Sequence, residues 1–281
     1  MSNIINAIIN LVTDPRIKLR EYASGHNRAN DMGKGLEEYI KDLFAGTINE
    51  TNEDKRNIAL SNVFSYLGNQ NNPPDAMLRG GDAIEVKKIE SDNSSLALNS
   101  SYPKAKLFSD SSMISAACRS CENWSVKDMI YAVGVVQSGT LSSLAMVYGD
   151  DYCADKSVYE KIKNVIKTGV QSIPDVEFAE TNELGRVNRV DPLGITYLRV
   201  RGMWGIENPF NVFDYLFKRS SDKNFNFMCI INDDKWSTFD NTAELLALSK
   251  KINGLAITDV KIKSPNNPAQ LKNAKLITFV I

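Results

Sequence analysis

The sequence is poor in the residues on which metal-stabilised and disulfide-stabilised proteins depend. Its 281 residues include four cysteines and a single histidine, His26. Cys118 and Cys121 form one CxxC, but no second pair follows, and structural zinc sites take four nitrogen or sulfur ligands. Two thiols one turn apart on a helix from about 113 to 124 is the favoured interpretation, and a disulfide-stapled secreted fold is excluded.

The sequence also lacks excess charge and long apolar runs. Lysine and arginine total 33 against 34 aspartate and glutamate, a net charge of −1, so any surface that attracts nucleic acid must be local. No apolar run approaches the roughly 18 residues of a membrane helix. The N-terminus "MSNIINAIINLVTDP" has no basic region typical of a secretory signal, and we expect a cytoplasmic protein. A GxxxxGK[ST] loop is absent, which argues against a nucleotide-hydrolysing motor.

What is present is an ordinary globular composition, 43% hydrophobic and 24% charged, with alternating helix and strand patterns. Without internal repeats or a long linker, the pattern predicts one α/β domain over 1–281, a mixed central sheet flanked by helices with a C-terminal elaboration. The predicted helices cover 3–12, 33–46, 157–170, 209–218 and 241–252, and the predicted strands cover 129–137, 143–149, 195–200, 225–232, 255–263 and 274–281.

The stretch "NNPPDAMLRGGDAIEVKKIES" (71–91) predicts a hairpin that gathers charged residues. Glu85 and Lys87 lie two apart on a strand and so share a face. Whether Asp75 joins them depends on the turn. A two-residue turn at 80–81 sets Asp75 opposite Val86 and facing away, whereas a three-residue loop over 80–82 sets it opposite Lys87 on the shared face.

Converging carboxylates beside a lysine are typical of phosphodiester hydrolysis. Asp75 and Glu85 could bind a hard cation such as Mg²⁺ through oxygen. Lys87 could orient or deprotonate a water, or stabilise the charge of the transition state. The alternative is a turn bearing a surface ion pair worth less than about 1 kcal/mol.

Pro74-Asp75 followed by Glu85-Val86-Lys87 resembles the PD-(D/E)xK nuclease signature. That family places a helix carrying a glutamate before the hairpin, and "GKGLEEYIKDLF" is such a helix. Of its two acids, Glu37 lies at the edge of the apolar stripe and is the expected site residue, whereas Glu38 lies on the opposite side.

Longer stretches make the resemblance more specific. "NRAN", "ALNSSYPKAKL" and "LGRVNRVDPLGITYLRVRGMWGIENPF" are similar to the NgoPII-type restriction endonucleases, from the first helix to about Phe227. The resemblance implies a restriction-endonuclease-like core and Mg²⁺-dependent hydrolysis of double-stranded DNA at palindromic GGCC, leaving 5′-phosphate and 3′-hydroxyl ends. It also implies a homodimer and a cognate DNA methyltransferase.

Two further segments are candidates for DNA contact. One is a run of arginines with aromatic residues interleaved, since arginine is the commonest reader of guanine; pairing with Glu183 or Asp191 is the alternative. The other is the polar loop after the catalytic strand, which is either a donor set for phosphates and bases or a plain surface loop. Arg79 and Lys88 are interpreted as solvated or phosphate-near charges. The candidate DNA-binding residues are Asn99, Ser100, Ser101, Lys104, Arg186, Arg189, Arg199 and Arg201, with Lys106 beside them.

Two other functions stay open on these residues. A repair or resolving nuclease of the same fold would read DNA structure instead of sequence. A non-catalytic DNA-binding protein would have kept the fold without cutting.

Overall fold

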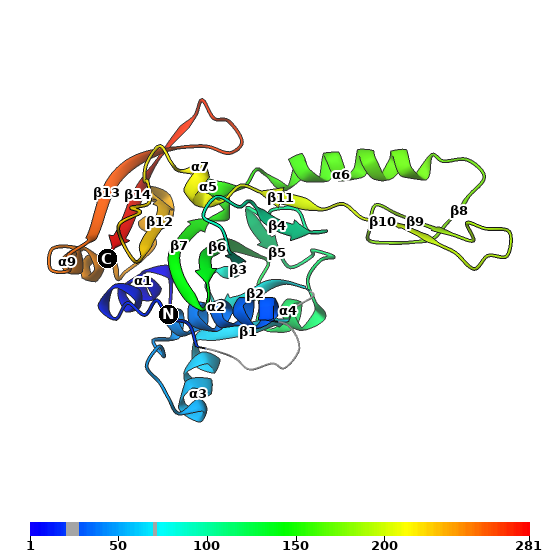
Figure 1. The fold of residues 1–281 in the computed structure, drawn as a ribbon. Helices are drawn as coiled ribbons and strands as arrows, with labels where there is room; N and C mark the ends of the chain where they lie inside the picture. The colour runs from blue at the N-terminus through cyan, green and yellow to red at the C-terminus, as the bar shows by residue number, and fades with distance from the viewer. Residues whose placement is uncertain (21–27, 70–71) are drawn as a thin grey trace.

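A mixed β-sheet forms the centre of the molecule in the computed structural model, which describes residues 1–20, 28–69 and 72–281 (Figure 1). Among these residues nine strands join it, eight of them in the order β1-β2-β3-β6-β7-β12-β14-β13, while β5 pairs with β6. The pairs β3–β6 and β7–β12 are parallel and the others antiparallel. The predicted fold class is therefore confirmed.

The helices are α1 (Ile4–Thr13), α2 (Arg28–Ala45), α3 (Glu53–Val63), α4 (Ala116–Ser120), α5 (Gly149–Tyr152), α6 (Lys156–Gln171), α7 (Pro209–Val212), α8 (Asp233–Trp236) and α9 (Thr242–Ser249). The strands of the central sheet are β1 (Phe64–Asn69), β2 (Asn72–Leu78), β3 (Ala83–Ile89), β5 (Lys106–Phe108), β6 (Val126–Gln137), β7 (Thr140–Tyr148), β12 (Asn226–Asn232), β13 (Leu255–Lys263) and β14 (Leu271–Val280). Two smaller sheets contain β4 (Leu96–Asn99) with β11 (Trp204–Ile206), and β8 (Glu177–Phe178), β9 (Gly185–Asn188) and β10 (Leu198–Val200).

The hairpin β6–β7 lies in the middle of the sheet because nearly all of its side chains are apolar and buried on both faces. Ser138 and Gly139 turn between the strands with φ of 49° and 79°, the left-handed geometry that two-residue hairpin turns favour. Both predicted strands here are confirmed and are longer than predicted.

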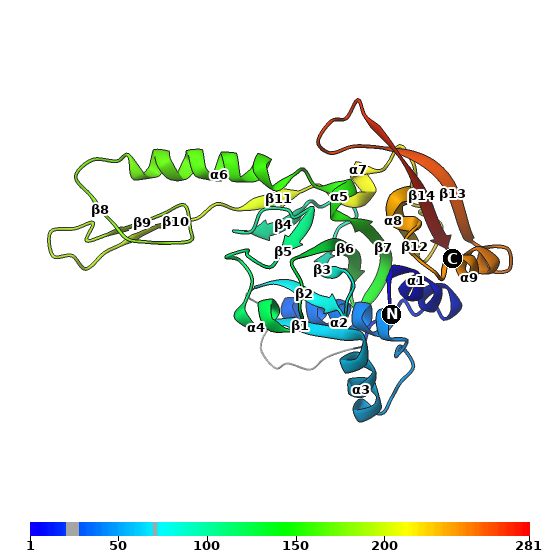
Figure 2. The ribbon, with the colours of Figure 1, turned by 180° about the vertical axis from the view of Figure 1, so that it is seen from behind.

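Helices α1 and α2 cover one face of the sheet (Figures 1 and 2). Asn3 caps α1 by accepting the backbone N–H groups of Ile5 and Asn6. Leu36 of α2 lies directly over Gly134 of β6, where an added Cβ would come within 2.8 Å of the leucine side chain. This close approach fixes the height of α2 above the strands that carry the candidate site.

The opposite face of the sheet is covered by shorter elements, among them α4. The predicted helix over 113–124 is wrong in extent. The Ser115 side chain accepts the Cys118 N–H and so sets the start of α4, which ends at Ser120. Cys118 is buried with its thiol 3.3 Å from Met77 Sδ, and all four cysteines are free.

An extension leaves the compact body, formed by α6 and the ribbon β8–β10, and we call residues 156–200 the arm (Figures 1 and 2). The predicted helix over 157–170 is confirmed, yet none of its residues is buried. The predicted strand over 195–200 forms only from Leu198 onward. Asp191 accepts the N–H groups of Leu193 and Thr196 and holds the preceding segment as a turn.

The C-terminal part of the chain completes the central sheet. The predicted strands over 225–232, 255–263 and 274–281 are confirmed as β12, β13 and β14. The predicted helix over 209–218 stops after α7, because the chain there passes into turns closed by the N–H groups of Leu216 and Phe217 on the Phe213 carbonyl. The predicted helix over 241–252 is shorter, as α9. Helix α3 was not predicted. In the described ranges, no helix is long and apolar enough to cross a membrane.

Candidate active site

The segment predicted as a hairpin is a three-stranded unit, since β1 pairs with β2 on the side away from β3. The loop between β2 and β3 has three residues, Arg79–Gly81, and is closed by the Leu78 N–H donating to the Asp82 carbonyl at 2.9 Å. Gly80 takes the left-handed conformation, with φ of 64°. The loop therefore lies one residue earlier than the predicted 80–82.

This loop changes the predicted register. Ala76 pairs with Ile84, so Asp75 comes opposite Glu85, and both registers considered from the sequence are wrong. The physical reason lies at Asp82, whose buried carboxylate is held by Lys235 and which is thereby kept at the start of β3 and out of the loop. Directly opposed residues of an antiparallel pair share a face, so Asp75 and Glu85 still lie on one side.

Backbone contacts fix the position of Asp75. Its Oδ2 accepts the Val86 N–H at 2.6 Å, which ties the aspartate to the middle of β3. On the other side, Gly68 of β1 leaves no room for a side chain, because an added Cβ would lie 2.4 Å from the Pro74 carbonyl oxygen. Gly68 was missed from the sequence, where "YLGNQNN" looks like an ordinary strand end.

Glu85 and Lys87 form the centre of the site. Lys87 Nζ donates to Glu85 Oε1 at 2.6 Å. Glu85 Oε2 is buried and has no hydrogen-bond partner among the described residues. Burial, with the neighbouring charge of Glu85, raises the pKa of Asp75 well above its usual range. Burial disfavours the charged form of Lys87, but Glu85 and Asp75 outweigh it and raise the pKa of the lysine.

Helix α2 brings one of its two glutamates to these residues. Burial raises the pKa of Glu37, and the charges of Lys87 and Glu85 both act on its carboxylate. Glu38 is engaged elsewhere, accepting from Lys41 at 2.9 Å and Arg56 at 2.7 Å. The structure thus gathers four predicted residues, which we call the carboxylate cluster: Glu37, Asp75, Glu85 and Lys87.

The carboxylate cluster suits a divalent cation that takes only a few of its ligands from the protein. Three acids lie around Lys87, and a buried oxygen of Glu85 has no hydrogen-bond partner among the described residues, so the pocket can accept a further positive charge. The described residues contain no group of three or more His, Cys, Asp or Glu side chains arranged to hold a metal. Two carboxylates with water and substrate oxygens match the way Mg²⁺ is bound, since it keeps several waters.

The polar loop after β4 lies beside the carboxylate cluster. Lys104, Ser101, Tyr131 and Glu85 line one cavity of about 20 Å³. Tyr131, the β6 neighbour of Glu85, accepts the Lys104 N–H at 2.7 Å through its hydroxyl, and Lys104 Nζ donates to Ser101 Oγ. Burial lowers the pKa of Lys104, against the effect of Glu85. Asn99 and Ser100 are exposed at the end of β4.

The four candidate arginines lie in or just beyond the arm and not at the carboxylate cluster (Figure 1). Arg199 and Arg201 both pair with Glu183, at 2.6 Å each, which is the alternative weighed from the sequence. Asp191 binds Thr196 and no arginine. Arg186 lies 5.0 Å from the Tyr197 ring, and Arg189 lies 3.8 Å from Glu177.

Other candidates fall into structural roles. Arg79 donates to the carbonyls of Ser61 and Phe64, and Lys88 pairs with Glu90 at 2.8 Å. His26 and Asn27, the first residue of "NRAN", lie outside the described residues.

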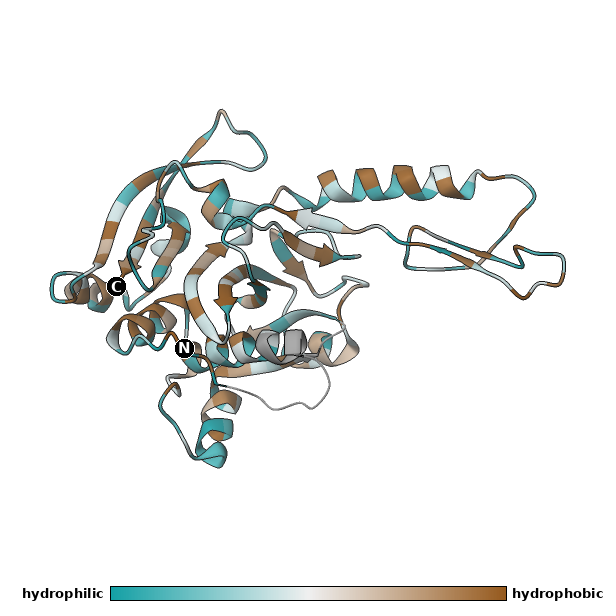
Figure 3. Ribbon diagram, in the orientation of Figure 1, coloured by the Kyte–Doolittle hydropathy of each residue, from teal (hydrophilic) through white to brown (hydrophobic). Residues whose placement is uncertain are grey.

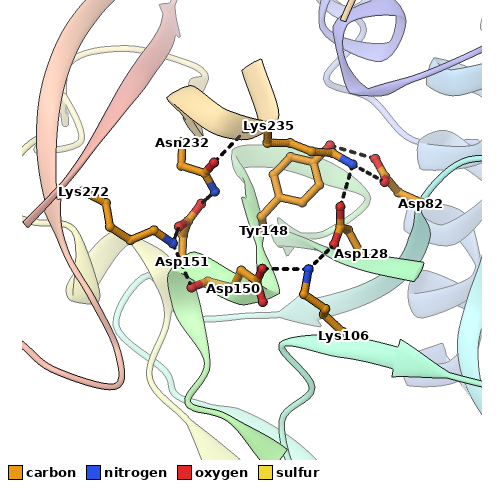
Figure 4. Close-up of polar contacts among 9 residues, drawn as sticks. All are labelled: Asp82, Lys106, Asp128, Tyr148, Asp150, Asp151, Asn232, Lys235 and Lys272. Carbon is orange, nitrogen blue, oxygen red and sulfur yellow. Dashed lines mark hydrogen bonds and ion pairs between the residues drawn. The ribbon is translucent and has the colours of Figure 1, made fainter. Parts of the chain in front are cut away.

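A second charged group lies at the start of β3 (Figure 4). Lys235 bridges Asp82 at 2.6 Å and Asp128 at 2.7 Å. Lys106 bridges Asp128 at 2.8 Å and Asp150 at 3.0 Å. The Tyr148 hydroxyl donates a hydrogen bond to Asp82 at 2.8 Å. We call this group the ion-pair network: Asp82, Lys106, Asp128, Asp150 and Lys235. Its members come from five separate segments of the chain, and no local spacing in the sequence predicts it.

Comparison of the sequence with known proteins identifies the family of this chain. The family model for the NgoPII restriction endonuclease matches residues 2–263. The Type II restriction enzyme NgoPII of Neisseria gonorrhoeae is 61% identical over 278 residues, covering 99% of both chains, so the similarity extends well past Phe227. No solved structure matches. The predicted resemblance and enzyme class are confirmed: the chain belongs to the NgoPII restriction endonuclease family.

Proposed function

We propose that this endonuclease hydrolyses both strands of DNA at palindromic GGCC with Mg²⁺, leaving 5′-phosphate and 3′-hydroxyl ends. The observation that carries the chemistry is the carboxylate cluster, in which Glu85 Oε2 is buried without a partner beside Asp75 and Lys87. The GGCC target comes from the resemblance to the NgoPII-type enzymes alone.

In this proposal Asp75 and Glu85 hold the metal. When bound, Mg²⁺ would neutralise charge on the scissile phosphate and lower the pKa of a water. Partial burial lowers the local dielectric around both carboxylates and strengthens their attraction for a cation. The Val86 N–H engages one oxygen of Asp75, Oδ2, and fixes the carboxylate in place.

Lys87 is the residue that handles the attacking water. Its ammonium, held by Glu85 at 2.6 Å, is placed to donate a hydrogen bond to the water or to a phosphate oxygen. The water oxygen bonds to phosphorus as the bond to the 3′-oxygen breaks. The attacking water releases a proton to solvent, and the leaving oxygen takes up a proton from solvent to become the 3′-hydroxyl. Glu37 adds negative charge beside Lys87 and favours its protonated form.

The loop after β4 is proposed to hold the DNA backbone at the site. Ser101 and Lys104 line the cavity next to Glu85, and Asn99 and Ser100 offer exposed polar groups close by. The Tyr131 hydroxyl positions this loop through the Lys104 N–H.

The arginines of the arm are proposed to contact DNA from the ribbon face. Arg186 and Arg199 are direct cross-strand neighbours, and like charges in that position repel one another. Glu183 offsets only part of this positive charge, since Arg199 and Arg201 share that one carboxylate. Arg186, Arg189, Arg199 and Arg201 form a local basic surface on a chain of near-zero net charge, as DNA binding requires.

The biological setting follows from the family. A palindromic target is matched by two copies of the chain related by a two-fold axis. We infer a homodimer that acts in the cytoplasm, where a cognate methyltransferase would protect the host's own sites.

The test is cleavage of a long duplex of known sequence with Mg²⁺, with EDTA, and with the Glu85→Ala variant, followed by mapping of every cut end. Metal-dependent cuts confined to GGCC and lost in the variant would support target and site together. Cuts at another palindrome would show that the proposed GGCC target is wrong. Cutting by the Glu85→Ala variant would show that the proposed active site is wrong. Preference for branched DNA would favour a repair or resolving nuclease, and binding without any cleavage a non-catalytic protein.

A further inference from the structure

Helix α6 exposes one apolar side along its length. Its large aliphatic side chains recur at helical spacing, and 44% to 66% of each is exposed. Figure 3 shows these apolar bands on the arm. We call the set the α6 stripe: Val158, Ile162, Val165 and Ile166.

The α6 stripe is not the side by which the helix joins the rest of the molecule. Tyr159, on a neighbouring side, stacks on Tyr102 with ring centroids 5.6 Å apart and meets Trp204 edge-on. Near the other end, Val170 packs so closely on Gly185 of β9 that an added Cβ would lie 2.7 Å away. The helix is therefore already attached, and the α6 stripe is a second apolar side that the described residues leave exposed.

DNA does not suit this surface. Aliphatic side chains offer no donor to phosphate, and Lys161 is the charged residue on the free flank, between Ser157 and Thr168. Another apolar surface does suit it. Gly169 lies on the same side with open space around it, so a second helix could approach closely there.

The arm exposes further large apolar side chains beyond helix α6. Ile173, Val190, Leu193, Ile195 and Leu198 are 48% to 83% exposed. Together with the α6 stripe they offer an area on the order of 800 Å², which is what one partner buries in a standard-size interface. A symmetric pair needs a surface that complements itself, and an apolar helix face with a single flanking charge meets that need.

We propose that the α6 stripe is the surface on which a second copy of this chain docks, so that two carboxylate clusters reach one duplex. This rests on the proposed double-strand cleavage. The apolar side of the arm then joins the two copies. Arg186 and Arg199 alternate with Val187 and Leu198 along the ribbon, so they face its other side and stay free for DNA.

The test compares two glutamate substitutions at equally exposed helix positions, Val165→Glu in the α6 stripe (66% exposed) and Ile58→Glu in α3 (61% exposed). Molecular mass is measured by sedimentation equilibrium at micromolar concentration in EDTA, without DNA. Wild type and Ile58→Glu are expected at twice the mass of one chain, and Val165→Glu at the mass of one chain. An Ile166→Lys variant is expected to behave as Val165→Glu does, with circular dichroism confirming that each variant is folded.

A dimeric Val165→Glu variant, or a monomeric wild-type chain, would overturn the proposal. Because no cleavage is needed, the outcome separates from that of the proposed function. If the wild type cuts both strands and Val165→Glu stays dimeric, the proposed function is supported and the proposed interface is wrong. If the wild type is a dimer that does not cut DNA and Val165→Glu is a monomer, the proposed interface is supported and the proposed function is wrong.

Discussion

The carboxylate cluster lies at the middle of β3 and the ion-pair network lies at its start, and the two contain similar residues but differ in how their charges are matched. In the ion-pair network two lysines each bridge two aspartates, at 2.6 to 3.0 Å. In the carboxylate cluster the one ion pair joins Lys87 to Glu85 at 2.6 Å, and Glu85 Oε2 has no partner among the described residues. Buried carboxylates are stable when paired, so a matched group indicates a structural role and an unmatched one indicates a site kept for a ligand.

The largest expected difference between the two groups is in catalysis. Glu85→Gln keeps the shape of the side chain but removes the charge that holds Lys87, and it should lower cleavage by about 10³-fold. Asp128→Asn, the matched change in the ion-pair network, should leave cleavage by folded protein within a few-fold. Single-turnover rates on a GGCC duplex, measured at a temperature where both variants are folded, provide the comparison. Equal losses would mean that the two groups do not differ in function.

The reverse substitution should act on stability. Lys235→Met leaves Asp82 and Asp128 without the cation that bridges them, and Asp82 is 6% exposed. We expect the free energy of unfolding to fall by about 2 kcal/mol, less than for a fully buried pair because the lysine is partly exposed. Urea unfolding measures this. Lys87→Met should cost less stability, although it abolishes cleavage; a larger cost for Lys87 would contradict the assignment of roles.

The unmatched charge should also make stability depend on pH. The pKa of Asp75 is raised in the folded chain, so between its unfolded value near 4 and its folded value the native state binds the extra proton. Stability of the metal-free protein then falls as pH rises through this range. Asp75→Asn removes this titrating carboxyl group. The variant should have a higher Tm than the wild type in EDTA, and the increase should be larger at pH 8 than at pH 5. A difference of about 1 kcal/mol corresponds to roughly 2–4 °C. A benefit that is the same at both pH values would argue against a raised pKa.

Sequence reasoning found the carboxylate cluster because its residues lie on one short segment and one helix with clear periodicity. It placed Glu85 and Lys87 on one face, and it chose Glu37 over Glu38 by the edge of an apolar stripe. It failed on the loop register, since Asp82 is held by Lys235, 153 residues later in the chain. The ion-pair network was missed for the same reason, because its residues meet only through long-range packing that no local pattern contains.

Some interpretations of the sequence stay predictions. The contact of the arm arginines with DNA is one, and the division of the chain into a single domain is another. Helix α6 is instructive, because its periodicity predicted a helix correctly while its position in the arm leaves the apolar side exposed. An amphipathic pattern says that a face will be covered, but not whether the cover comes from the same chain.

The smallest expected effects distinguish two adjacent residues of α2. Glu38 binds Arg56 at 2.7 Å, and Asp42 binds the same guanidinium at 2.7 Å, so Glu38→Gln weakens a shared ion pair and should cost about 1 kcal/mol of stability without changing cleavage. Glu37 acts on Lys87 and Glu85 through its charge, so Glu37→Gln should slow cleavage about 10-fold and leave stability unchanged or slightly higher, because a buried charge is removed. Unfolding curves and single-turnover rates for both variants form a crossed comparison. If Glu38→Gln slows cleavage as much as Glu37→Gln does, the two acids are not divided between a structural and a catalytic group, and the boundary of the carboxylate cluster at Glu37 is wrong.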